Sequence, residues 1–220
     1  IIFQILLFLS LFYFRIPINN IYFGSPSKKP DVIDHYTFNI IVYINFVLFL
    51  SFLNLDINNI LIISFIFLFF FLTFNIKNFL TQLKQITENY FLFIILFIAL
   101  IVISIDISNS ITLGWDAQKI WIPKTINFYN NGTIVNLKFL DKGDGYDYPY
   151  LGSLLWAIFW KISFLKEEYF GRLFYGFIYI VSLLSLTNRL NSSLYSKKIL
   201  FLILVLLSYD YIYFAGEQDI

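Results

Sequence analysis

The chain has 220 residues, of which 59% are hydrophobic, 22% are aromatic and only 13% are charged. Soluble domains are nearer half apolar and a quarter charged, so this chain lacks the polar side chains that cover a water-exposed globule, and we expect it in a lipid bilayer. The 15 basic and 14 acidic residues leave a net charge of +1. This balance excludes the basic field of a nucleic-acid-binding protein.

Cysteine and histidine limit the chemistry further. The sequence contains no Cys and a single His, His35. Disulfide frameworks, thiolate nucleophiles, zinc–thiolate sites and iron–sulfur clusters are therefore excluded, and so is a metal site built from histidines. The sequence specifies no cofactor with certainty. A divalent cation remains open, and it would need carboxylate and carbonyl oxygens as ligands.

Hydropathy predicts an all-α fold, a polytopic transmembrane bundle of about six to seven membrane segments. A bilayer crossing needs roughly 20 apolar residues, and we find seven candidate stretches. Because the chain starts inside the first stretch and contains no Met, we interpret it as a fragment, cut at the N-terminus and also at the C-terminus. The stretches are about 1–14, 37–54, 60–74, 90–106, 149–165, 169–188 and 198–214.

Lysine and arginine in short loops predict the orientation, because cytoplasmic loops are enriched in them. The loops 15–36 and 75–89 carry them and the 55–59 turn has none. The segment 90–106 then crosses outward, and 107–148 is external. The chain divides into N-terminal membrane segments with cytoplasmic loops (1–106), the long external loop with short interfacial helices (107–148), and further membrane helices (149–220).

The first half of the external loop has the pattern of an interfacial helix. Gly114-Trp115-Asp116-Ala117 stands at the membrane exit, and apolar residues then recur at helical spacing with Lys119 and Lys124 between them. This pattern is typical of a helix lying in the headgroup layer. Asp116 stands at its start, where a carboxylate can simply cap the helix by accepting backbone N–H bonds. On position alone we favour capping.

Acidic and aromatic side chains of the loop's second half, and the four tryptophans of the chain, each allow two interpretations. The loop acids fit solvated residues beside an interfacial tyrosine belt. Tryptophan faces stack on sugars and prenyl chains, but Trp is also the standard anchor at a membrane interface, which we favour. The residues are Asp141, Asp144, Tyr146, Asp147, Tyr148 and Tyr150 in the loop, and Trp115, Trp121, Trp156 and Trp160.

Several short motifs occur between about 90 and 220, and their order and spacing are similar to those of a known family. GWDA-x-x-IW-x-x-K begins at Gly114, DYP-x-L begins at Asp147, EEYFGRL leads into the next helix at Arg172, and AGEQDI closes the chain. In this order and spacing the chain resembles bacterial GT-C glycosyltransferases of the RgtA/B/C/D-like or dolichyl-phosphate-mannose–protein mannosyltransferase-like type.

The resemblance implies a transferase of the bacterial inner membrane. Such an enzyme moves a sugar from a polyprenyl-phosphate donor to a hydroxyl of a glycan, lipid or protein acceptor on the non-cytoplasmic face, without nucleic acid as a partner. It makes Asp116 the catalytic general base. It also implies substrate-binding roles: carboxylates that line the cavity (Asp147 and Asp219), cations that hold the donor phosphate (Lys124 and Arg172), and aromatic contacts (Trp115 and Tyr148).

This chemistry agrees with the residue types. An acceptor hydroxyl must lose its proton as the bond to the anomeric carbon forms, and a carboxylate within hydrogen-bond reach takes that proton. The leaving phosphate needs nearby Lys or Arg side chains. A single displacement inverts the anomeric carbon, whereas retention by double displacement needs a second carboxylate about 5 Å away.

The topology poses a conflict for a shared cavity. If three full crossings separate Asp116 from Asp219, the two carboxylates lie on opposite sides of the membrane. Residues 151–163 would span only about 20 Å as a helix, less than the roughly 30 Å hydrocarbon core, and Lys161 interrupts them. We therefore expect a partial or re-entrant element there.

Two further functions remain open. The chain fits a transporter or flippase of a lipid-linked or anionic solute, in which Asp116, Asp210 and Asp219 bind substrate or protons. Inverted repeats and broken helices, which are typical of transporters, are not evident in the sequence. The third interpretation is a membrane subunit whose external loop docks a partner.

Overall fold

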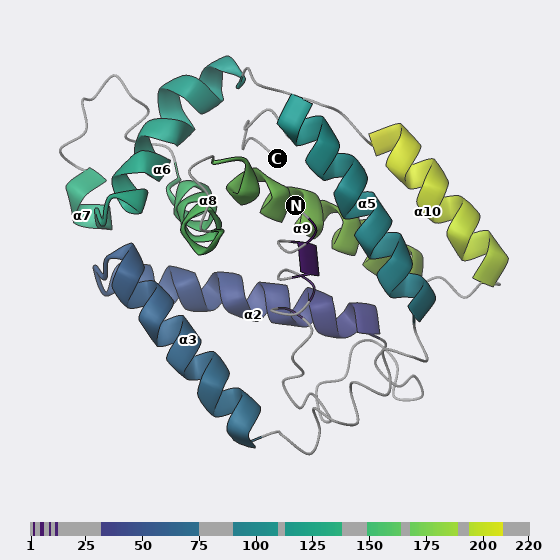
Figure 1. Cartoon of the computed structure of the whole chain (residues 1–220), viewed down its shortest axis with the longest axis horizontal. Helices are drawn as coiled ribbons and strands as arrows, with labels where there is room; N and C mark the ends of the chain where they lie inside the picture. Colours follow the sequence, from purple (N-terminus) through teal and green to yellow (C-terminus); the bar gives the residue numbers. More distant parts are fainter. Residues whose placement is uncertain are drawn as a thin grey trace.

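Helices make up all of the regular structure that the computed structural model describes (Figure 1). The described residues are 32–74, 90–109, 113–137, 149–163, 168–188 and 194–208, with Ile2, Ile5, Leu6, Leu9 and Phe12. The helices are α2 (Val32–Phe52), α3 (Ile57–Phe74), α5 (Tyr90–Asn109), η1 (Ala117–Trp121), α6 (Ile122–Tyr129), α7 (Ile134–Leu137), α8 (Leu151–Ile162), α9 (Tyr169–Asn188) and α10 (Leu194–Ser208). The predicted all-α class is confirmed over these residues, and every predicted apolar stretch from 37 onward contains a helix.

Two helices are long and apolar enough to cross a membrane, judged by length and composition over the described residues. They are α2, over Ile33–Phe52, and α9, over Tyr169–Thr187. The apolar parts of α3, α5 and α8 are shorter over these residues. With 12 residues, α8 is about 18 Å long. This helix is shorter than a hydrocarbon core of roughly 30 Å, as expected for this stretch, while its partial or re-entrant insertion stays a prediction.

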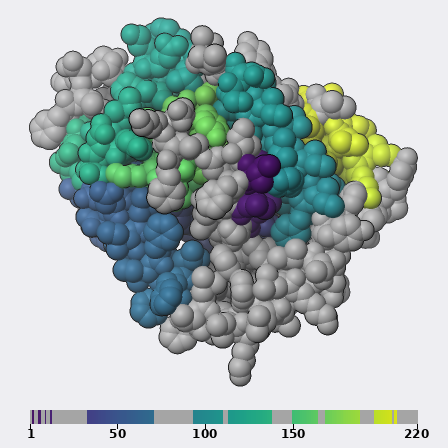
Figure 2. Space-filling model, in the orientation of Figure 1, coloured from purple at the N-terminus to yellow at the C-terminus, as the bar shows by residue number. Residues whose placement is uncertain are grey.

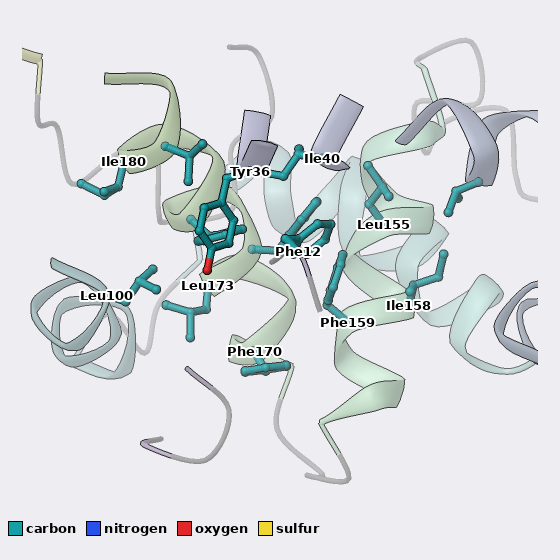
Figure 3. Close-up of a cluster of buried hydrophobic side chains, with 14 of the residues drawn as sticks. Phe12, Tyr36, Ile40, Leu100, Leu155, Ile158, Phe159, Phe170, Leu173 and Ile180 are labelled. Carbon is teal, nitrogen blue, oxygen red and sulfur yellow. The ribbon is translucent and has the colours of Figure 1, made fainter. Parts of the chain in front are cut away.

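The central element is α9, which contacts α2, α5, α8 and α10. Its apolar residues recur at the spacing of one helical face, and Phe170, Leu173, Phe174 and Phe177 are all fully buried. The ring of Phe174 stacks on that of Phe159 from α8, with 4.0 Å between the centroids. Figure 3 shows how side chains from several helices converge on this core.

The turn between α2 and α3 lies against the segment that follows α6. Asn54 there has a φ of 56°, and its Oδ1 accepts a hydrogen bond of 3.3 Å from the backbone N–H of Val135 in α7. Nearby, the Lys161 Nζ of α8 donates to the carbonyl oxygen of Tyr129 at 2.9 Å and to Asn131 Oδ1 at 2.7 Å. The α2–α3 turn and α7 thus lie at the same end of the molecule (Figure 1).

Large apolar side chains remain exposed on the outer helices, which Figure 2 shows on the surface of the molecule: α3 in blue, α5 in teal and α10 in yellow. Such a surface is unusual for a monomeric soluble protein and fits contact with lipid. Large apolar side chains more than two-fifths exposed are Ile62, Phe65, Ile66, Phe67, Phe69 and Phe70 on α3, Ile94, Ile98, Val102 and Ile105 on α5, and Ile199, Leu202, Ile203 and Leu207 on α10.

Candidate functional site

A π-helical turn, η1, carries the first motif of the external loop. The backbone N–H of Ile122 donates to the carbonyl oxygen of Ala117, five residues earlier, instead of the usual four. Pro123 follows directly. Proline has no N–H and its ring crowds the carbonyl four residues before it, so regular α-helical bonding is broken at this position. Single π-helical turns of this kind frequently mark functional sites.

Asp116 immediately precedes η1, and its side chain is partly exposed. Its backbone is helical (φ −64°, ψ −38°), and its carboxylate makes no capping hydrogen bond to η1. The turn is closed by Gln118 instead, whose backbone N–H donates to the carbonyl oxygen of Gly114 and whose Nε2 donates to that of Leu113. The favoured capping interpretation of Asp116 is therefore wrong for η1.

Lys124 is buried, although the sequence placed it with Lys119 on the polar side of an interfacial helix. Lys119 is exposed as expected, but the Lys124 side chain is fully enclosed, and its Nζ lies 5.6 Å from the centre of the Trp121 ring. This geometry is that of a cation–π contact, which is stronger when the cation is desolvated. Lys124 therefore lies on the enclosed side of the helix, and its role in holding a phosphate stays a prediction.

A buried cluster around two tryptophans connects η1 to α8. Its buried members are Ala117, Ile120, Trp121 and Trp156, with Tyr175 of α9 packed against them. Trp121 is 3% exposed and Trp156 is fully buried. Interfacial anchoring, the favoured interpretation for the tryptophans, is therefore wrong for these two. We call this set the tryptophan cluster.

Hydrogen bonds reinforce the tryptophan cluster. The Ser153 hydroxyl of α8 donates to the carbonyl oxygen of Trp121 at 3.2 Å, and that of Thr125 donates to the same oxygen at 2.8 Å. The Tyr175 hydroxyl donates to the carbonyl oxygen of Gly152 at 2.7 Å. These bonds join η1, α6, α8 and α9 into one unit. Each bond also satisfies a buried polar group, which would be costly to leave without a hydrogen-bond partner.

Arg172 forms an ion pair with Glu168 at the start of α9. Its Nη2 lies 2.9 Å from Glu168 Oε1, and its Nε donates to Oε2 at 3.2 Å. The Trp156 indole N–H donates to the same carboxylate at 3.0 Å. Burial raises the pKa of Glu168, while the charge of Arg172 and the hydrogen bonds act in the opposite direction.

Sequence reasoning missed Glu168 as a site residue. The signal was present, because Glu168 and Arg172 are four residues apart at the start of a predicted helix, the spacing at which opposite charges meet. The contact of Glu168 with Trp156 across α8 and α9 depends on the fold and has no sequence signal. The guanidinium group of Arg172 is thus paired with the carboxylate of Glu168 in the folded protein.

Four of the seven predicted site residues lie in the described part of the chain. Lys124 contacts Trp121 of the tryptophan cluster, and Arg172 is joined through Glu168 to Trp156 of the same cluster. Trp115 and Asp116 lie at the start of the segment that carries Trp121, and Trp115 is 69% exposed. Asp147, Tyr148 and Asp219 lie outside the described residues.

Within the described residues, no group of three or more His, Asp or Glu side chains is arranged to hold a metal ion. No protein-family model matches this chain, and neither a curated protein nor a solved structure matches it at a significant level. The chemistry of the site therefore has to be argued from its own residues.

Proposed function

We propose that this chain is part of a GT-C-type membrane glycosyltransferase, which transfers a sugar from a polyprenyl-phosphate donor to an acceptor hydroxyl on the non-cytoplasmic face. The main support is the position of Asp116. It is a partly exposed carboxylate that directly precedes a π-helical turn, it does not cap that turn, and the turn packs on inner helices in which Lys124 and Arg172 are buried.

The reaction is a single displacement with inversion. Asp116 takes the proton of the acceptor hydroxyl as its oxygen forms a bond to the anomeric carbon, while the bond from that carbon to the phosphate oxygen breaks. The electron pair leaves with the polyprenyl phosphate. A cation near the leaving group stabilises its charge. Lys124 and Arg172 are the candidates, and both are buried in the inner helices.

A membrane location supports this assignment. The exposed side chains of α3, α5 and α10 are large and apolar, and no Lys, Arg, Asp or Glu occurs between Ile57 and Phe74 in α3. We propose that these helices lie in the hydrocarbon layer with α2 and α9, as part of a bundle of six to seven segments in the bacterial inner membrane. The end that carries the α2–α3 turn, α7 and η1 faces outward.

The Asp116→Asn variant tests the catalytic assignment. The protein is purified in detergent and incubated with a panel of radiolabelled polyprenyl-phosphate sugars, and transfer to glycan, lipid and peptide acceptors is measured. Loss of a general base lowers such rates by about 10²- to 10⁴-fold, so transfer should fall at least a hundredfold without loss of thermal stability.

The matched control is Asp34→Asn, the same change in the first turn of α2. We expect it to keep the wild-type rate. Wild-type transfer by Asp116→Asn would refute the role of Asp116. Movement of the labelled lipid across vesicles without covalent transfer by the wild type would instead favour the transporter or flippase.

A further inference from the structure

The end of α6 is completed by a side chain from another helix. The last four carbonyl groups of an α-helix need donors from beyond its final turn. In α6 the carbonyls of residues 126–128 accept hydrogen bonds from the backbone N–H groups that follow them, those of Asn130, Asn131 and Gly132. The fourth carbonyl, that of Tyr129, accepts a hydrogen bond of 2.9 Å from the Nζ of Lys161 in α8. Lys161 thus supplies the donor that completes the end of α6.

The same ammonium group connects α8 with two further places. It donates to Asn131 Oδ1 at 2.7 Å, and it lies 5.4 Å from the centre of the Tyr129 ring. It also interacts electrostatically with Asp56, in the turn between α2 and α3. A Lys in the last turn of a helix ordinarily favours the carbonyl end of its own helix, but these hydrogen bonds go to α6 and to the residues that follow it.

A second hydrogen bond from α8 holds the same helical run at another point. Residues 115–129 form one uninterrupted run that contains η1 and α6. The carbonyl oxygen of Trp121 accepts from the Ser153 hydroxyl at 3.2 Å, and that of Tyr129 accepts from Lys161. The two contacts are eight residues apart on both helices, which is about 12 Å of helix. Two such points resist rotation of the run on α8, whereas one hydrogen bond alone leaves that rotation possible.

The position of Asp116 depends on the second point through leverage. Asp116 is five residues before Trp121 and Tyr129 is eight residues after it, which correspond to about 7.5 Å and about 12 Å of helix. A rotation about the Trp121 contact that moves Tyr129 by about 2 Å would therefore move Asp116 by about 1.2 Å. A misplacement of about 1 Å can lower a reaction rate by about 10²-fold.

We propose that Lys161 is a positioning residue, whose ammonium group holds the end of α6 on α8 and so fixes the place of Asp116. Its importance for the reaction rests on the proposed function, in which Asp116 is the general base. Lys161 acts through α6 and not on the substrate. Its effect on the position of η1 is a property of the fold, and it can be measured without any reaction.

The test measures the position of η1 directly. Because the chain contains no Cys, spin labels can be attached to two introduced cysteines, Lys119→Cys on η1 and Ser182→Cys on α9, both at exposed positions. Pulsed electron–electron double resonance in detergent then gives the distribution of distances between the labels. We expect a narrow distribution in this parent protein, a broadened or shifted one in Lys161→Met, and a narrow one again in Lys161→Arg, which keeps the charge.

The matched control is Lys198→Met, the same change on α10, which packs on α9. It should leave the distribution as in the parent protein. Thermal unfolding establishes that each variant folds. If Lys161→Met does not fold, Lys161→Gln takes its place, because the Gln side chain is neutral and shorter but still polar.

Two distance results would overturn the proposal. In the first, the neutral variant at position 161 keeps the parent distribution, which would mean that the ammonium group does not hold α6. In the second, Lys161→Arg is displaced as much as the neutral variant, which would assign the effect to the shape of the lysine side chain and not to its charge.

The transfer assay links this position to catalysis. Lys161→Met should lower kcat by up to about a hundredfold with an unchanged KM for the donor, because a displaced base weakens the transition state and not donor binding, and Lys161→Arg should restore most of the rate. A displaced η1 with a wild-type kcat would overturn the positioning role. A wild-type protein without transfer activity would instead refute the proposed function and leave the distance result unaffected.

Discussion

The inner unit of η1, α6, α8 and α9 and the outer helices α3, α5 and α10 use apolar residues in opposite ways. In the inner unit, aromatic rings such as Phe174 and Trp156 are fully buried, and the indole N–H of Trp156 is hydrogen-bonded to Glu168. On the outer helices, rings such as Phe69 point away from the protein. Large apolar side chains occur in both regions, so hydrophobicity alone does not tell a buried core from an exposed apolar surface.

The two regions also differ in their charges. The inner unit encloses Lys124 and the Arg172–Glu168 pair, whereas the whole of α3 contains no charged residue. Burying a charge is costly unless it is paired or serves a function. The location of the buried charges, more than that of the apolar residues, therefore identifies the region where chemistry is expected.

The largest expected effect is on the free energy of unfolding, and it comes from comparing a buried with an exposed phenylalanine. Phe174→Ala removes a fully buried ring that stacks on Phe159, and we expect it to lower the free energy of unfolding by about 4 kcal/mol. Phe69→Ala removes a ring that is 65% exposed and should change it by less than about 0.5 kcal/mol. Denaturant unfolding in one detergent measures both. Equal losses would contradict the distinction between the two regions.

A second variant tests how closely α8 and α9 pack. A methyl group added at Gly171 would lie 2.6 Å from the carbonyl oxygen of Trp156, a backbone atom that cannot move away by rotating a side chain. We expect Gly171→Ala to lower the free energy of unfolding by about 3 kcal/mol, in the same unfolding experiment. Ser182→Ala, at an exposed position of the same helix, is the control and should have almost no effect. A stable Gly171→Ala protein would mean that the two helices separate easily.

The smallest expected effect concerns pH. Burial raises the pKa of Glu168 above its ordinary value of 4.5, so the folded state binds more protons than the unfolded state between the two values. The free energy of unfolding should therefore fall as the pH rises from the ordinary value through the raised one. Glu168→Gln should weaken this dependence, as measured by thermal unfolding from about pH 4 to pH 7.

The control for this pH series is Asp34→Asn, outside the network of Trp156, Glu168 and Arg172. Asp34→Asn should show the same decrease in the free energy of unfolding over this pH range as the wild type. If Glu168→Gln also leaves it unchanged, another group is responsible, and the carboxylate of Glu168 is better solvated than its contacts indicate.

Several features of the site could be predicted from sequence because their signals are local. Pro123 disrupts α-helical hydrogen bonding within one turn, and Glu168 and Arg172 are four residues apart, the spacing at which opposite charges pair. The short element at 149–165 followed from its length and from Lys161. Asp116 was placed correctly at the start of a helix, but the absence of a capping bond depends on Gln118 and on the π-helical turn, which the sequence pattern does not show.

The sequence by itself determined that the chain is helical and apolar, where its helices lie, and which residues carry charge, because helical periodicity and hydropathy are properties of neighbouring residues. Only the tertiary structure decided which side of each helix is enclosed. Lys124, Trp121 and Trp156 became interior residues because α8 and α9 pack against η1, while Trp115 stayed exposed. Such contacts join residues far apart in the chain, and a local pattern contains no information about them.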